Sequence, residues 1–189
     1  MLKKIFLLAF TMCLFAGTAN AAPIKFSFWG TGSGTLDQTD FNAADFTIEL
    51  FADTNNITTD GFTESLLADS ATFSIDGVGS GFFSEILRMF TNHIGTGLGR
   101  PANSDLIDFL NTPELKSYDL ASSTAIYSEA SPCCAFAFSG LTTSLGALGF
   151  SSYGEVSFQA TLTNVPEPAP LALLGLGLMA LVLVRKRRG

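Results

Sequence analysis

The strongest constraint on the fold of this chain is an alternation of apolar and polar residues that recurs in four separate stretches. In each stretch an apolar side chain occupies every second position, and the residues between are charged or polar; the stretches are 24–28, 46–50, 72–75 and 155–162. Successive side chains of a β-strand point to opposite faces, so a period of two predicts strands with one buried and one solvated face.

Helical patterns are scarce, and turn-forming residues punctuate the rest of the middle of the chain. Weaker strand candidates are separated by clusters of Gly, Ser, Thr and Asn and lie at 82–90, 105–110, 135–138 and 145–150. The helical candidates are 113–117 and, as an alternative to a strand, 83–90. The glycine-rich stretches 30–34 and 77–81 are expected to form tight turns, in which glycine supplies a positive φ.

Many short strands with Gly-rich turns predict an antiparallel β-sandwich for residues 22–164, a segment long enough for one domain. Its core should consist mainly of phenylalanine, because 15 of the 18 phenylalanines of the chain lie in this segment. The residues expected inside are Phe26, Phe28, Phe46, Ile48, Phe73, Ile75, Val156, Phe158 and Leu162.

A surface that binds carbohydrate needs exposed Trp or Tyr, because sugar rings stack on aromatic faces. The candidates in this segment are Trp29, Tyr118, Tyr127 and Tyr153. Trp29 is expected instead to close one end of the core.

The N-terminus, residues 1–21, has the pattern of a secretory signal peptide. Lys3 and Lys4 form a positive region, residues 5–15 an apolar region, and Ala19 and Ala21 an A-x-A cleavage site. An uncleaved anchor is the alternative, disfavoured because the apolar run is short and ends in small residues. The sequence therefore predicts export through the secretion translocon and cleavage by signal peptidase.

The C-terminal tail, residues 165–189, combines three features in a fixed order. They are the turn Val165, Pro166, Glu167 and Pro168; the uncharged apolar run 171–184; and the basic cluster Arg185, Lys186, Arg187 and Arg188. A helix over the run would span roughly 21 Å at ~1.5 Å per residue, against about 30 Å for a hydrocarbon core. The run predicts a single marginal transmembrane helix, and the basic cluster is expected to stop transfer and stay in the cytoplasm. An ordinary permanent anchor is the alternative.

The ordered trio of Pro166-Glu167-Pro168, apolar run and Arg-rich end resembles the PEP-CTERM sorting signal of Gram-negative bacteria. The resemblance implies that the partner is an exosortase, which cuts near the Pro-Glu-Pro after the chain is held briefly in the inner membrane. It also implies delivery to the cell surface or extracellular matrix. The order of segments within 30–162 resembles, more loosely, a recurring all-β ectodomain that precedes such tails.

The charge of residues 22–164 limits the partners of this segment. Sixteen of the 17 acidic residues lie here with only four basic ones, Lys25, Arg88, Arg100 and Lys116, which gives a net charge of −12. Such a surface repels nucleic acid and anionic lipid. Nucleic acid is therefore excluded as a partner, and contact with the membrane is assigned to the tail alone.

Few residues of the chain fit a known catalytic motif. His93 is the only histidine, which excludes multi-histidine zinc sites and makes it the one available base for a Ser-His-Asp triad. Neither glycine-rich stretch is a nucleophile elbow, because Thr31 and Val78 stand where G-x-S-x-G requires glycine.

Acidic side chains offer two weaker hypotheses. The carboxylate pairs that a glycosidase would need are Asp37 with Asp40 and Asp105 with Asp108, for which solvated turns are the favoured interpretation. Residues 53–56 with Asp60 supply oxygen ligands for calcium but lack the Gly and bidentate Glu of an EF-hand. The sequence predicts no catalytic residue, no metal site and no cofactor.

Cys133 and Cys134 are the only cysteines left after signal cleavage. They can bond to each other in an eight-membered ring, pair with another chain, or serve as two small buried apolar side chains. The last interpretation is favoured.

Two classes of function remain. The first, favoured by the thin catalytic inventory, is a non-catalytic protein of the cell surface or extracellular matrix, associated with exopolysaccharide or a biofilm. The alternative is a secreted β-sandwich carbohydrate-active enzyme or carbohydrate-binding module.

Overall fold

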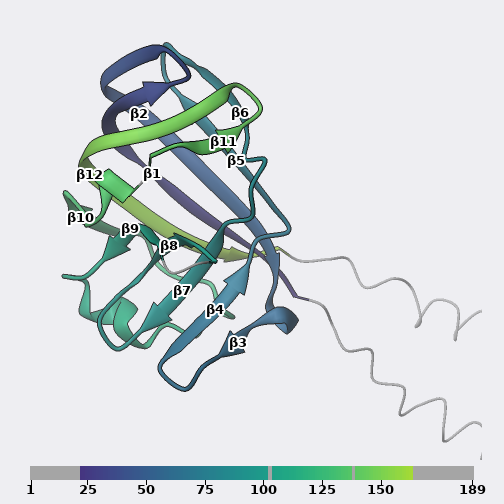
Figure 1. Cartoon of the computed structure of the whole chain (residues 1–189). Helices are drawn as coiled ribbons and strands as arrows, with labels where there is room; N and C mark the ends of the chain where they lie inside the picture. Colours follow the sequence, from purple (N-terminus) through teal and green to yellow (C-terminus); the bar gives the residue numbers. More distant parts are fainter. Residues whose placement is uncertain (1–21, 102–103, 138, 164–189) are drawn as a thin grey trace, which may run out of the picture.

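The computed structural model of the chain describes residues 22–101, 104–137 and 139–163. Within these residues the protein is all-β, and its strands form one seven-stranded and one five-stranded antiparallel sheet. Figure 1 shows the two sheets with the long strands β1, β2 and β12 crossing the molecule. The predicted all-β, antiparallel fold is confirmed.

The larger sheet has a continuous path of six strands with a seventh beside it. In spatial order the path is β10 (Tyr127–Ala130), β12 (Gly146–Leu162), β1 (Pro23–Leu36), β2 (Thr39–Asp53), β5 (Ser70–Ile75) and β6 (Gly79–Phe82), and β11 (Leu141–Thr143) pairs with β12. The smaller sheet consists of β3 (Thr58–Thr59), β4 (Thr63–Leu67), β7 (Arg88–Asn92), β8 (Thr96–Arg100) and β9 (Ser104–Phe109). Three short 3-10 helices complete the elements: η1 (Thr54–Asn56), η2 (Pro113–Ser117) and η3 (Ala135–Ala137).

The four alternating stretches form β1, β2, β5 and β12, which are neighbours in the larger sheet. Eight of the nine residues predicted inside are buried, and Leu162 is 37 % exposed. The prediction for Leu162 is wrong because Leu162 is the last residue of β12, at the end of the sheet. Its backbone N still donates a hydrogen bond to Ser123 Oγ (2.9 Å).

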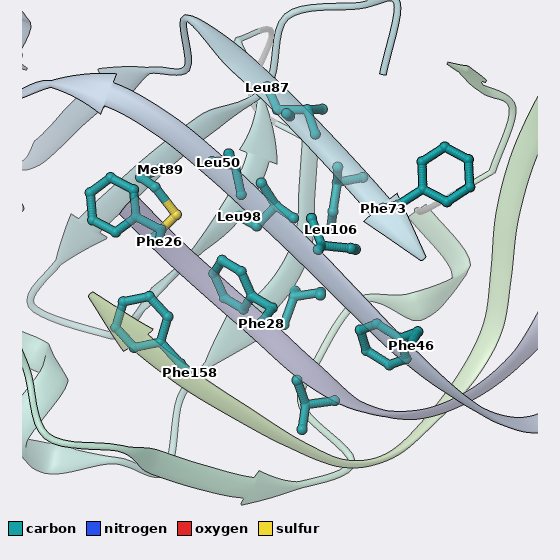
Figure 2. Close-up of a cluster of buried hydrophobic side chains, with 14 of the residues drawn as sticks. Phe26, Phe28, Phe46, Leu50, Phe73, Leu87, Met89, Leu98, Leu106 and Phe158 are labelled. Atoms are coloured by element: carbon teal, nitrogen blue, oxygen red, sulfur yellow. The ribbon is translucent and has the colours of Figure 1, made fainter. Parts of the chain in front are cut away.

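The core lies between the two sheets and is largely aromatic. Phe28 of β1 and Phe158 of β12 have ring centroids 5.0 Å apart, and Phe109 of β9 in the smaller sheet lies 6.2 Å from Phe28 and 6.0 Å from Phe158. Figure 2 shows how Phe26, Phe28 and Phe158 share the core with aliphatic side chains from both sheets. These side chains remove a large apolar area from water, which is the main term favouring the fold.

At one end the larger sheet closes on itself. The hairpin of β11 and β12 is joined to the end of β6 by the Phe83–Thr143 bridge and by backbone hydrogen bonds from Ser84 N to Thr142 O and from Ser144 N to Phe82 O, each 2.9 Å. This closure is visible where β2, β6, β11 and β12 curl together in Figure 1. Closing a sheet satisfies backbone groups that an open edge would leave exposed to other chains.

One of the two predicted glycine turns is wrong. Residues 30–34 lie inside β1, which is irregular in register there, and not in a turn. Their glycines are needed for close approach, because a Cβ on Gly30 would overlap Glu155 O of β12 and one on Gly34 would overlap Gly149 O. The prediction for 77–81 is confirmed in part: Gly77, with φ 70°, lies in the turn between β5 and β6, whereas residues 79–81 belong to β6.

The weaker secondary-structure predictions have mixed outcomes. Residues 105–110 correspond to β9, and 113–117 form the 3-10 helix η2. Residues 83–87 are neither helix nor strand before β7 begins, and 135–137 form η3 instead of a strand, with residue 138 outside the described residues. Short segments of mixed polarity carry no clear period, so their tertiary surroundings decide their conformation.

The two ends of the domain lie side by side (Figure 1). Ile24 of β1 is paired with Leu162 of β12, and Thr163 donates hydrogen bonds from N (2.8 Å) and Oγ1 (2.9 Å) to Pro23 O. The chain therefore enters and leaves the fold at one corner.

Among the described residues, no helix has the length and apolar character needed to cross a membrane. The predicted signal peptide, 1–21, and the apolar run 171–184 both lie outside the described residues.

Replacing Phe158 by alanine should lower the free energy of unfolding by about 3–5 kcal/mol, because a fully buried ring leaves a cavity between the sheets. The matched control is Phe62→Ala: this ring is 54 % exposed, and the change should cost less than about 0.5 kcal/mol. Denaturant unfolding of a protein comprising residues 22–164, followed by circular dichroism, measures both. Equal losses for the two variants would contradict the described core.

Candidate functional site

The predicted processing residues lie outside the described part of the chain. These are Ala19 and Ala21 at the signal cleavage site, Val165, Pro166, Glu167 and Pro168 at the sorting site, and Arg185, Lys186, Arg187 and Arg188 in the basic cluster. The structure shows instead where the folded domain meets them. Thr163, which is bonded to Pro23, is only three residues before Pro166.

The face of the larger sheet turned away from the core carries a continuous line of polar side chains around one tryptophan. In β1, Trp29 follows the buried Phe28, so its side chain lies on the opposite, outer face of the sheet. Its cross-strand partners are Thr47 of β2 and Ser157 of β12. The pairing continues outward on both sides, so that one residue from each of six adjacent strands lies in a row. We call this the Trp29 row: Ser128, Ser157, Trp29, Thr47, Ser74 and Ser80.

The hydroxyl groups at the two ends of the Trp29 row are paired. Ser128 Oγ and Ser157 Oγ are 2.8 Å apart, and Ser74 Oγ and Ser80 Oγ are 2.7 Å apart. Beside Thr47 the surface is hollowed by an open depression of about 390 Å³, lined mainly by Thr47, Glu49, Thr72, Ser74 and Ser80. Glu49 is neutralised by Lys25, whose Nζ lies 2.8 Å from its Oε1. The Trp29 row thus presents hydroxyls and one indole, with the Lys25–Glu49 ion pair on one side and the exposed carboxylates Asp45 and Glu155 on the other.

The prediction that Trp29 closes the core is wrong, because its position in the β1 register places it on the outer face, where it is half-buried. The side chains of the other aromatic candidates are buried or partly buried in the fold. Tyr118 and Tyr153 are buried and donate hydrogen bonds to Ser122 O (2.7 Å) and Leu106 O (3.2 Å), and burial raises the pKa of both. Tyr127 is partly buried against the core. Trp29 is therefore the aromatic residue of this group that lies on the solvated sheet face.

A cavity of about 290 Å³, which we call the His93 cavity, is lined in part by His93 and lies beside the paired strands β4 and β7. The imidazole packs edge-on against the exposed ring of Phe62, with centroids 5.8 Å apart. In the described part of the chain no hydrogen bond joins His93 to a serine or a carboxylate, so no Ser-His-Asp arrangement is formed among these residues. The carboxylates of the cavity are Glu64 and Asp119.

Asp119 is a structural carboxylate. Burial opposes its charge, but hydrogen bonds from Ala121 N and from Ser122 N and Oγ outweigh that effect and lower the pKa of Asp119. It closes the turn after η2, and a lowered pKa disfavours the protonated form that a general acid requires.

The pair Asp105 and Asp108 lies on β9. Burial raises the pKa of Asp105 in spite of Arg88, whose Nη2 is 3.7 Å away. Burial, followed by the neighbouring charges of Asp105 and Glu129, raises the pKa of Asp108 to about 6. Asp108 is only 7 % exposed, and within the described residues its Oδ1 has no hydrogen-bond partner. It does not line the His93 cavity.

The remaining acidic candidates lie in turns. Asp37 and Asp40 are exposed at the β1–β2 turn. Asp53 Oδ1 accepts from Asn55 N at the start of η1 (2.9 Å), and Asp60 Oδ1 accepts from Phe62 N (2.9 Å) and Thr63 N (2.7 Å). The hydrogen bond from Thr63 N is the largest cause of a lowered pKa at Asp60. In the ranges that the structure covers, no group of three His, Cys, Asp or Glu is placed to hold a metal ion.

Cys133 and Cys134 are bonded to each other. The favoured interpretation of two buried thiols is wrong: both residues are half-buried, and Cys133 N donates to Asp108 O of β9 (3.2 Å). Cys134 has φ 86°, so the disulfide lies in a tight turn just before η3. Two adjacent cysteines allow several outcomes, and no pattern in the sequence separated them.

Comparison with known proteins identifies the tail. Residues 164–188 match the PEP-CTERM protein-sorting motif. The motif indicates an exported protein that is sorted by an exosortase, and the all-β domain precedes this motif in the chain. No curated protein and no solved structure matches the chain.

The stability of the domain should depend on the proton of Asp108. The folded protein keeps this proton up to about pH 6, whereas an unfolded aspartate loses it near 3.8. The folded state thus binds more protons between these values, and the free energy of unfolding should fall on the order of 2–3 kcal/mol as pH rises through them. Asp108→Asn should remove this contribution and be the more stable variant at about pH 7. An unchanged pH slope in the Asn variant, measured by denaturant unfolding, would refute the role of Asp108.

Proposed function

We propose that the protein is a non-catalytic component of the cell surface or extracellular matrix that associates with exopolysaccharide. The observation that carries the proposal is the sorting motif at 164–188 directly after a folded ectodomain. The motif indicates an exported protein that is sorted by an exosortase. The non-catalytic role of the ectodomain and its association with exopolysaccharide are the parts that we propose.

The proposed route follows from the two termini. Signal peptidase removes residues 1–21, and the tail holds the chain in the inner membrane with its basic cluster in the cytoplasm. Because Pro23 and Thr163 meet at one corner of the fold, the new N-terminus and the sorting site are expected at the same end of the domain. The prolines of the sorting site disfavour a helix and favour an extended backbone, the form that a peptidase accepts.

A binding role agrees better than catalysis with the chemistry of the described side chains. A glycosidase needs two carboxyls across a cleft, one of them with a raised pKa. Here the carboxyl with the pKa of about 6, Asp108, is buried on β9, whereas Asp119 in the His93 cavity has a lowered pKa. The outer face with Trp29 favours the carbohydrate-binding form of the alternative function over its enzymatic form.

Replacing Pro166-Glu167-Pro168 by three alanines should block processing. We expect an uncut protein retained in the inner membrane, because the exosortase no longer meets its extended recognition site. The chain offers a matched control in Pro113-Glu114, an exposed Pro-Glu pair at the start of η2; alanines there should leave sorting unchanged. Cell fractionation with intact-mass measurement distinguishes the two, and normal localisation of the tail variant would contradict the sorting role.

Deleting Arg185, Lys186, Arg187 and Arg188 should weaken the retention of the chain in the membrane, whereas the cleavage site itself stays intact. Without the positive charges the apolar run loses its stop, so uncut chain should leave the membrane before it is processed. The measurement is the mass of the protein in the culture supernatant. If the surface-extracted wild-type protein still carries residues up to Gly189, the tail acts as a permanent anchor.

The non-catalytic proposal has its own test. Purified protein should release no reducing sugar from exopolysaccharide extracted from the producing cells. Release that is lost on Glu64→Gln or Asp108→Asn would replace the proposal by the enzymatic alternative.

A further inference from the structure

We propose that the Trp29 row is a binding site for an uncharged polysaccharide chain. The proposal rests on the association with exopolysaccharide proposed above and adds its location and the chemical class of its ligand. The row crosses six hydrogen-bonded strands, from β10 to β6, at right angles to their direction. With about 4.8 Å between neighbouring strands, it extends over ~24 Å, a length suited to an extended polymer.

Trp29 supplies the apolar surface of this site. It occupies the third position of the row, with Ser157 on one side and Thr47 on the other, so only small side chains flank its indole. A sugar ring is apolar on its C–H faces and polar around its edge. The indole can therefore cover such a face while the flanking hydroxyls reach the edge.

The hydroxyls of the row retain hydrogen-bonding capacity. Each hydroxyl has one donor and two acceptor lone pairs. The pairs Ser128–Ser157 and Ser74–Ser80 each use one donor, which leaves a donor and several acceptors on each pair. Groups that both donate and accept match the hydroxyls of a polysaccharide.

Charge disfavours an anionic ligand. The row itself has no ionisable side chain, and in one neighbouring row Glu49 is paired with Lys25 at 2.8 Å. On the other side of the row, the exposed carboxylates Asp45 and Glu155 lie two residues before Thr47 and Ser157 on the same face. Together with the net charge of −12 of the segment 22–164, these carboxylates repel an anionic polymer, whereas the hydroxyls and the indole of the row offer contacts to an uncharged one.

A protein partner fits this face less well. Interfaces between proteins are built around a contiguous apolar centre. Here the exposed apolar side chains Phe51 and Phe82 lie in other rows than Trp29, with polar residues between them. A second copy of the chain is an outcome that the experiment detects.

The first measurement uses the protein's own fluorescence. Trp29 is the only tryptophan in the chain, so its emission reports on this face alone. The full chain, purified in a detergent without a sugar headgroup, is titrated with hydroxyethyl cellulose, with dextran, with alginate as the anionic probe, and with polysaccharide extracted from the producing cells. At least one uncharged polymer should shift the emission and protect Trp29 from acrylamide quenching, and alginate should not.

The second measurement compares how strongly each variant is retarded in gels that contain the polymer bound by the wild type. Trp29→Ala should weaken binding about tenfold or more, as expected for a central aromatic contact. Thr47→Arg keeps the fluorophore and, at an exposed position, leaves the core intact; it should abolish the emission change. The matched controls are Thr58→Arg on β3 and Phe62→Ala at the His93 cavity, and both should bind like the wild type.

The outcomes separate this inference from the proposed function. If no uncharged polymer changes the emission or the gel mobility of the wild type, or if the wild type binds alginate alone, the Trp29 site and the proposed function are both overturned. If binding persists in folded Trp29→Ala and Thr47→Arg proteins, or is lost only in Phe62→Ala, the proposed function stands and the Trp29 row is not the site. An emission change that depends on protein concentration without polymer identifies a second copy as the occupant and also overturns the inference.

Discussion

The rest of the structure depends on the pairing of β1 with two long strands, one on each side. Its register runs from Ile24–Leu162 to Leu36–Leu148 with β12, and from Pro23–Asp53 to Leu36–Thr39 with β2. The first strand of the domain is therefore completed by the last. Such pairing of distant segments is slow to form, and it requires nearly the whole ectodomain to be exported before the sheet can close. It also brings together the two ends of the fold, one of which leads to the sorting motif at 164–188.

The same three strands divide the molecule by polarity. Their inner positions carry Phe28, Phe46 and Phe158, which meet the smaller sheet through Phe109. Their outer positions carry hydroxyls, the Lys25–Glu49 ion pair and the exposed carboxylates Asp45 and Glu155 around Trp29. A register shift of one residue would exchange the two faces. Packing of the aromatic core thus fixes the register of the three strands. The register in turn determines which side chains lie on the outer face.

The carboxyls with perturbed pKa values owe them to their positions in the fold. Asp108 has a raised pKa because β9 buries it beside Asp105 and Glu129, away from the His93 cavity. Perturbed carboxyls often mark active sites, but structural networks perturb them as well. Asp60 and Asp119 have lowered pKa values because they accept backbone hydrogen bonds in turns. The perturbed pKa values of these three carboxyls are therefore explained by burial and turn structure, without a catalytic role.

The sequence by itself determined four strands of the larger sheet, most of their buried positions and the sorting tail. Alternation identified β1, β2, β5 and β12, and the order of turn, apolar run and basic cluster identified the motif at 164–188, because both are local patterns. Only the tertiary structure decided that residues 30–34 lie in a strand, that Cys133 bonds to Cys134, and that Trp29 faces outward. It alone aligned the serines of β10, β12, β5 and β6 with Trp29. Cross-strand neighbours are set by register between distant segments, and a period within one segment carries no information about that register.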